Sequence, residues 1–229
     1  MKEKGKYSSL LNELQSELSQ FFKINLYKKY NRAYNKFQKD GLIHVISFQL
    51  GEYPIGNYVI PGLRESLYGK CAINLGVYIP YIDHFENHYN INIKSGVKEY
   101  HCEIRERLSI NPNEDFWIDL SKDISEIKNH VQNLIEKKGF PFLEQFQSIN
   151  DIILYYDKHG EIPFNNYERS MFSVALIYYG MGNIKKFDEY SNTIITKCSH
   201  KGFVEYVKGV YNQLMSTEML NKRARTNCT

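Results

Sequence analysis

Three segments in the first half of the chain alternate apolar and polar residues at a period of two, the pattern of β-strands with one buried face. They span residues 42–50, 71–79 and 100–108. Asp40-Gly41 precedes the first segment and predicts a tight hairpin turn into it. Because strands joined by turns pair with their neighbours, we expect these segments to form an antiparallel sheet.

The spacing of apolar residues is that of helices on both sides of these segments. Residues 7–22 predict an N-terminal helix, and residues 28–37 predict a short additional strand. Beyond the third strand the pattern is helical, and its first helix is expected over 121–138, ended by Gly139 and Pro141. The fold class is therefore α+β, with an N-terminal helix, an antiparallel sheet of about four strands and an all-helical C-terminal half.

A length of 229 residues with 42% apolar residues is enough for one large domain or two small ones. We expect an α+β domain over residues 1–160 and a helical extension over 161–229 that packs on it. The extension contains a predicted helix pair, 168–180 and 183–197. A single domain that covers the whole chain is the alternative.

Polar residues of the three predicted strands form a candidate binding site. They are Gln49, Asn74, His101, Glu103, Arg105 and Arg107, the last four at strict period two. Neighbouring strands would gather them into one patch, with Tyr100 and Cys102 turned towards the apolar core. Arginines two residues apart on a strand can bind a carboxylate or phosphate through paired donors. The alternative is an ordinary solvent face with cross-strand ion pairs.

Two long connections, residues 51–69 and 81–99, are predicted as loops. The second contains three candidate interface aromatics, Tyr81, Phe85 and Tyr89. His84 and His88 have the i, i+4 spacing of a metal-chelating pair, but such a pair must lie on a helix. Because the surrounding segment has no helical pattern, we expect no metal site there.

Charge and motifs argue against several classes of function. The 29 basic and 26 acidic residues give a net charge of +3, too balanced for a dedicated nucleic-acid-binding protein. A Gly-rich phosphate loop, a GxSxG elbow and a CxxC pair are all missing from the sequence, so we expect no cofactor and no catalytic residue. No apolar run approaches the roughly 20 residues that span a bilayer. We therefore expect a cytoplasmic protein without membrane contact.

Several short motifs are similar to those of the bacterial domain-of-unknown-function family 4304. They are Phe48-Gln49, Asn74-Leu75-Gly76, Cys102-Glu103-Ile104-Arg105-Glu106-Arg107-Leu108 and Trp117. The resemblance covers about residues 25–140 and leaves a helical C-terminal extension outside. It implies no known activity and assigns no catalytic residue. Proteins of this type are often encoded near polymorphic-toxin genes, so the resemblance implies an immunity role.

Two functions of different classes are consistent with these observations. The first is a non-catalytic protein-binding protein, most concretely an immunity protein that neutralises a cognate bacterial toxin. The second is a small-molecule anion-binding protein or enzyme, in which Arg105 and Arg107 hold the anion and His101 or Glu103 acts as acid or base. Nucleic-acid binding through the same arginines and the basic tail, residues 222–225, is the weakest of the alternatives.

Overall fold

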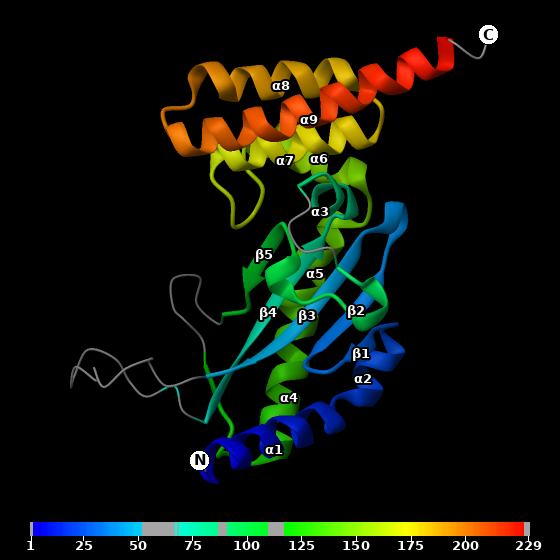
Figure 1. Ribbon diagram of the computed structural model, residues 1–229. Coiled ribbons are helices and arrows are strands. Elements are labelled where there is room, and N and C mark those ends of the chain that lie inside the picture. Colours follow the sequence, from blue (N-terminus) through cyan, green and yellow to red (C-terminus); the bar gives the residue numbers. More distant parts are fainter. Residues whose placement is uncertain (1, 52–66, 68, 87–90, 110–116, 227–229) are drawn as a thin grey trace. The chain divides into compact units, whose positions relative to one another are not determined.

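The computed structural model describes residues 2–51, 67, 69–86, 91–109 and 117–226, and the side chains of all these except residues 2–4 and 219–226. The chain forms two compact units, whose elements are labelled in Figure 1. The sheet unit contains Met1–Tyr78 and Asn92–Gln147, and the helical unit contains Ile79–Ile91 and Ser148–Thr229. The expected domains, 1–160 and 161–229, stay a prediction, because a compact unit is not by that fact an independently folding domain.

The sheet unit is built on an antiparallel sheet, which confirms the predicted α+β class. Its strands hydrogen-bond in the order β1-β2-β3-β4-β5, and β6 also pairs with β4. The strands of the described part of the chain are β1 (Lys28–Tyr30), β2 (Ala33–Phe37), β3 (Ile43–Leu50), β4 (Lys70–Tyr78), β5 (Ile104–Arg107) and β6 (Ile118–Asp119). Two of the three predicted long strands, β3 and β4, are thus present within one residue of their expected bounds.

Tight turns connect the first three strands. Residues 38–42 join β2 to β3, and Asp40 and Gly41 in this connection have positive φ values of 56° and 76°. Phe37 pairs with Ile43 on either side of the connection, so β2 and β3 form a hairpin that turns at Asp40-Gly41, as predicted. The segment expected as one additional strand is instead a hairpin of β1 and β2, and Asn31 in its turn has a φ of 56°.

Helices of the same unit cover one face of the sheet, and Figure 1 shows α4 and α5 behind the strands. They are α1 (Lys2–Glu17), α2 (Ser19–Ile24), α4 (Ile124–Leu134) and α5 (Phe140–Leu143). Phe22 of α2 stacks on Tyr34 of β2 with 3.7 Å between ring centroids, and it meets Phe48 of β3 edge-on at 6.3 Å. Burial of these rings joins the N-terminal helices to the sheet, because each removes a large apolar area from water.

The helix predicted over 121–138 is not ended by Gly139 and Pro141. Its α-helical part, α4, follows the cap residue Asp123, whose side chain accepts two backbone N–H groups. The chain then continues through a π turn, η4 (Ile135–Gly139), into α5, where Pro141 lies in the first turn. Pro141 has no N–H to donate to the preceding turn, but Gly139 and Phe140 before it keep helical dihedral angles, so the helical path continues.

The third predicted long strand is shorter than expected. β5 begins at Ile104, while Tyr100 and His101 belong to a 3₁₀ turn, η3 (Glu99–His101). The side chain of Tyr100 is therefore 46% exposed instead of turned inward, although Cys102 is buried as expected.

One predicted loop contains regular structure. Within residues 81–99 the chain forms α3 (Pro80–Glu86) and a 3₁₀ turn, η2 (Ile93–Ser95). Most of the other predicted loop, residues 52–66 and 68, lies outside the described residues.

The helical unit confirms the predicted all-helical C-terminal half. After α3 it contains α6 (Ile149–His159), α7 (Tyr167–Gly180), α8 (Ile184–Lys197) and α9 (Lys201–Thr226). The predicted helix pair is α7 and α8, and Gly182 between them has a φ of 79°. The backbone of the basic tail is part of α9. In the part of the chain that is described, no helix combines the length and apolar character needed to cross a membrane.

His44 on β3 makes the stability of the sheet unit depend on pH. The imidazole is 2% exposed; in its neutral form Nε2 donates to the backbone oxygen of Phe146 at 2.8 Å and Nδ1 accepts from Gln38 at 3.1 Å. Burial, together with the charge of Lys36, lowers the pKa of His44 from 6.5 to about 4. Between pH 6.5 and about 4, His44 of the unfolded chain binds a proton that His44 of the folded chain does not. The free energy of unfolding therefore decreases as the pH falls.

We expect protonation of His44 to decrease the free energy of unfolding by about 3 kcal/mol as the pH drops from 6.5 to about 4. Urea unfolding at a series of pH values, followed by the fluorescence of the single tryptophan, measures this slope. His44→Gln should remove most of it, while His84→Gln, at an exposed histidine of α3, should retain it. An unchanged slope in His44→Gln would contradict the assignment.

Candidate functional site

The face of the sheet opposite the helices carries most of the predicted polar residues. Ser47 pairs directly with Asn74, and Asn74 pairs directly with Arg107, so side chains of β3, β4 and β5 share this face. Arg105 shares it too, because it lies two residues from Arg107 on the same strand. Alternation at period two therefore placed these residues correctly, although it did not determine their contacts.

Gln49, Asn74 and Arg107 form a hydrogen-bonded network across three strands. Asn74 donates from Nδ2 to Gln49 Oε1 at 3.0 Å. Arg107 donates from Nε to Asn74 Oδ1 at 3.0 Å and from Nη2 to Gln49 Oε1 at 2.7 Å. The guanidinium is also 5.1 Å from the ring centroid of Trp117, within the range of a cation–π contact. Arg107 is thus held in one orientation at the end of the sheet.

The segment 92–101 covers part of the same face and is attached to β2 by a buried amide. Asn35 donates to the backbone oxygen of Val97 and accepts from its N–H, both at 2.8 Å. Gly96 has a φ of 89°, and a Cβ on it would lie 2.3 Å from the Cβ of Tyr30. Only glycine fits this conformation and this close approach, so the segment is fixed against β1 and β2.

A groove of about 690 Å³ remains on this face where the segment 92–101 ends. We call it the sheet groove; its described lining is Tyr30, Asn31, Arg32, Ala33, Ser47, Phe48, Gln49, Leu50, Leu67, Lys98, Glu99, Tyr100, Arg107 and Trp117. It brings together residues that are far apart in the sequence and holds three cations, one carboxylate and three exposed or half-buried aromatic rings. Arginine, tyrosine and tryptophan, which this lining contains, are enriched in protein–protein interfaces.

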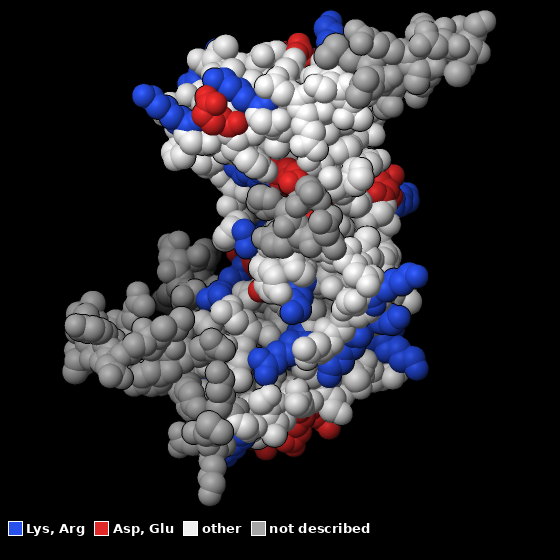
Figure 2. Space-filling model, in the orientation of Figure 1, with Lys and Arg blue, Asp and Glu red and all other residues white. Residues whose placement is uncertain are grey.

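Two lysines lie over tyrosine rings of the groove. Lys98 Nζ lies 5.4 Å from the ring centroid of Tyr100, and Lys28 Nζ lies 5.2 Å from that of Tyr30. The one carboxylate, Glu99, accepts a hydrogen bond of 2.5 Å from the hydroxyl of Ser47. In Figure 2, lysines and arginines gather on the sheet unit. The groove is therefore lined by more positive than negative charge.

The proposed acid–base residues are not part of this groove. His101 accepts the backbone N–H of Lys98 through Nδ1 and packs edge-on against Tyr100, so it serves as a cap of η3. The described lining includes Arg107, but it does not include His101, Glu103 or Arg105. The polar residues that the sequence predicted along one strand are thus separated, because η3 replaces the first residues of that strand.

Two of the aromatic interface candidates of the second connection, Tyr81 and Phe85, lie in the helical unit. Tyr81 and Phe85 stack on α3 with 6.2 Å between centroids, and Phe85 meets Tyr179 of α7 at 5.0 Å. Both rings are half-buried and pack on their own unit. Tyr89 and His88 lie outside the described residues.

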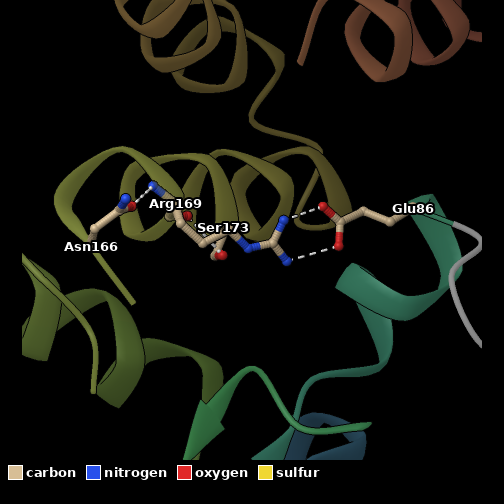
Figure 3. A network of polar contacts seen from close by, with 4 residues as sticks. All are labelled: Glu86, Asn166, Arg169 and Ser173. Atoms are coloured by element: carbon tan, nitrogen blue, oxygen red, sulfur yellow. Dashed lines mark hydrogen bonds and ion pairs between the residues drawn. The ribbon is translucent and has the colours of Figure 1, made fainter. Parts of the chain in front are cut away.

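A buried ion pair joins α3 to α7 within the helical unit. Arg169 donates to both carboxylate oxygens of Glu86, at 2.5 and 2.8 Å, as Figure 3 shows. The side chain of Glu86 is only 2% exposed, and that of Arg169 is 23% exposed. Burial and the nearby Glu86 carboxylate raise the pKa of Tyr206. The sequence does not predict this pair, because Glu86 lies in a segment with the pattern of a loop.

Reactive groups are sparse among the described residues. No cluster of three or more His, Cys, Asp or Glu side chains in this part of the chain could hold a metal ion. Cys71 and Cys102 are buried, and burial raises the pKa of Cys71 to about 12 and that of Cys102 well above its ordinary value. Both thiols are protonated at neutral pH, so neither is an activated nucleophile.

Of the described lining of the groove, only Gln49 and Arg107 were predicted site residues; the residues missed include Tyr30, Arg32, Lys98 and Trp117. Lys98 and Tyr100 follow each other at a spacing of two, and Lys28 and Tyr30 do the same. This repeated pairing of a lysine with a tyrosine is the one local signal that points to the groove. The closeness of the two pairs depends on the sheet.

Comparison with known proteins finds a family match that covers most of the sheet unit. Residues 18–145 match the family described as Domain of unknown function (DUF4304), which confirms the expected extent and leaves α6 to α9 outside. The match contains every described residue of the sheet groove. No curated protein and no solved structure matches the chain. Since the matched segment covers more than half of the 229 residues, the chain belongs to the DUF4304 family.

Proposed function

We propose that this chain is a non-catalytic protein-binding protein and that the sheet groove is its recognition surface. The observation that carries the proposal is Arg107, which Asn74 and Gln49 hold by hydrogen bonds and which lies over the ring of Trp117. Arginine and tryptophan are the side chains that most often dominate protein interfaces. A side chain that is already ordered loses little entropy on binding, so this pair is prepared for contact.

The finer proposal is that the partner is a cognate bacterial toxin and that this chain is its immunity protein in the cytoplasm. It rests on the genomic setting that the family resemblance implies. Neutralisation requires only a complementary surface that covers the toxin's site, and the sheet groove supplies shape, charge and aromatic contact area on one face. No reaction has to be assigned to the groove residues.

Capture of the partner from the native cell, followed by mass spectrometry, tests the proposal. We expect Arg107→Ala and Trp117→Ala each to weaken binding of the captured protein by about 30-fold or more, the effect of losing an interface hot spot. Lys208→Ala is the matched control, because it removes a surface cation of the helical unit. Its affinity should equal that of the unaltered chain.

Two results would contradict the proposal. One is equal capture of the partner by Arg107→Ala, Trp117→Ala and Lys208→Ala, with all three variants folded. The other is a small anion that co-purifies with the chain and is lost in Arg107→Ala, which would favour the anion-binding alternative. A captured protein without toxic activity would leave the recognition surface in place and remove the immunity role.

A further inference from the structure

We infer that the part of the partner that enters the sheet groove is an extended acidic peptide segment. This inference rests on the proposed function, which it deepens by naming the chemistry of the partner. It depends on three properties of the groove: the sign of its charge, the fixed positions of its cations, and its length across the strands.

The described lining carries Arg32, Lys98 and Arg107 against the single carboxylate of Glu99, a difference of two positive charges. Glu99 accepts a hydrogen bond from the hydroxyl of Ser47, so one of its oxygens already has a partner on the sheet. Lys28 adds a fourth cation beside Tyr30. A partner surface of opposite sign would be attracted before contact and would gain most where water is excluded.

The cations occupy defined positions. Arg32 donates from Nη2 to the hydroxyl of Ser8 at 3.0 Å, and Lys98 lies over Tyr100. Arg107 is held by the network described above. Guanidinium and ammonium groups fixed in this way can bind successive carboxylates with little loss of side-chain entropy.

The groove runs from the β1–β2 turn, at Asn31 and Arg32, across the sheet to Arg107 on β5. Neighbouring strands lie about 4.8 Å apart, so this path crosses roughly 15–20 Å. An extended chain advances about 3.3 Å per residue, and about five residues would therefore fill it. A stretch of this length with two or three acidic side chains would match the number of cations in the described lining.

The arrangement of the rings favours a peptide over single-stranded nucleic acid. Base stacking needs free ring faces. Here a cation lies over one face of each exposed or half-buried ring of the described lining: Arg107 over Trp117, Lys98 over Tyr100, and Lys28 over Tyr30. The rings thus position cations, and the groove presents charge at its surface.

Fluorescence anisotropy with the full chain tests the inference. The probe is a fluorescein-labelled ten-residue peptide of alternating Glu and Ser, compared with a Lys–Ser peptide and a labelled ten-nucleotide oligothymidine. We expect the Glu–Ser peptide to bind the tightest and to lose affinity about tenfold between about 20 and 200 mM NaCl, because salt screens exposed charges. Lys98→Ala combined with Arg32→Ala should weaken it at least about tenfold.

Lys98→Arg should retain binding, since it keeps the charge, and Lys208→Ala should leave binding unchanged. Circular dichroism melting identifies any variant that fails to fold. Equal binding of the Lys–Ser peptide, tighter binding of the oligonucleotide, or no effect of the double substitution in a folded protein would overturn the inference. A captured partner could also need Arg107 and Trp117 but bind through a basic surface, with an affinity that salt does not change. This result would overturn the inference and would still support the proposed function.

Discussion

Glu86→Ala is expected to lower the free energy of unfolding of the helical unit by about 3–5 kcal/mol. The substitution leaves the Arg169 guanidinium without the carboxylate that accepts two of its N–H groups. Because Glu86 is 2% exposed, little water can replace the lost partner. Urea unfolding followed by far-ultraviolet circular dichroism, which reports helices, measures the loss.

The matched control is Glu205→Ala, which breaks the exposed pair with Lys208 on α9. We expect it to cost less than about 1 kcal/mol, because solvent screens surface pairs. Glu86→Leu combined with Arg169→Met should be less destabilising than Glu86→Ala alone, since no charge is then left unpaired. Equal losses in Glu86→Ala and Glu205→Ala would show that the buried pair does not stabilise the unit.

Asn35→Leu is expected to lower the free energy of unfolding of the sheet unit by about 2–5 kcal/mol. Leucine branches at Cγ as asparagine does, but it cannot bond the N–H and the C=O of Val97, and both would be left buried without a partner. Lys98 and Tyr100 follow Val97 in the chain, so loosening this segment should also weaken binding at the sheet groove. Tryptophan fluorescence in urea reports the stability, because Trp117 lies in the sheet unit.

Asn192→Leu provides the control for this change. Its amide is exposed on α8 and bonds Asp188 one turn away, so its loss should change stability by less than about 0.5 kcal/mol. A similar small loss in Asn35→Leu would contradict the idea that one side chain attaches the segment 92–101 to the sheet.

The polar residues of the predicted strands show what a local sequence pattern can predict and what it cannot. Alternation along each strand predicted that Gln49, Asn74 and Arg107 would share a face, and pairing of β3, β4 and β5 places them within hydrogen-bonding distance. Side-chain direction on a strand follows from backbone geometry alone, which is why this part was predictable. The same rule failed at His101, where the chain forms η3 instead of a strand.

The failures share a physical cause. Segments such as η3 and α3 are held by partners far away in the sequence: Asn35 and Val97 are separated by 62 positions, and Glu86 and Arg169 by 83. A short stretch of sequence does not contain both members of such a pair. The local pattern of each segment therefore predicts a loop or a strand. The energy that decides their conformation comes from buried polar groups that must find a partner.

The sequence by itself determined the α+β class, the two long central strands, the hairpin turn at Asp40-Gly41 and the helical C-terminal half. These depend on hydrophobic period and on turn residues, which act over a few positions. The tertiary structure alone decided that Arg32, Lys98, Arg107 and Trp117 line one groove, because sheet pairing and the Asn35–Val97 attachment bring them together across the chain. Local chemistry therefore set the elements, and long-range hydrogen bonding created the candidate site.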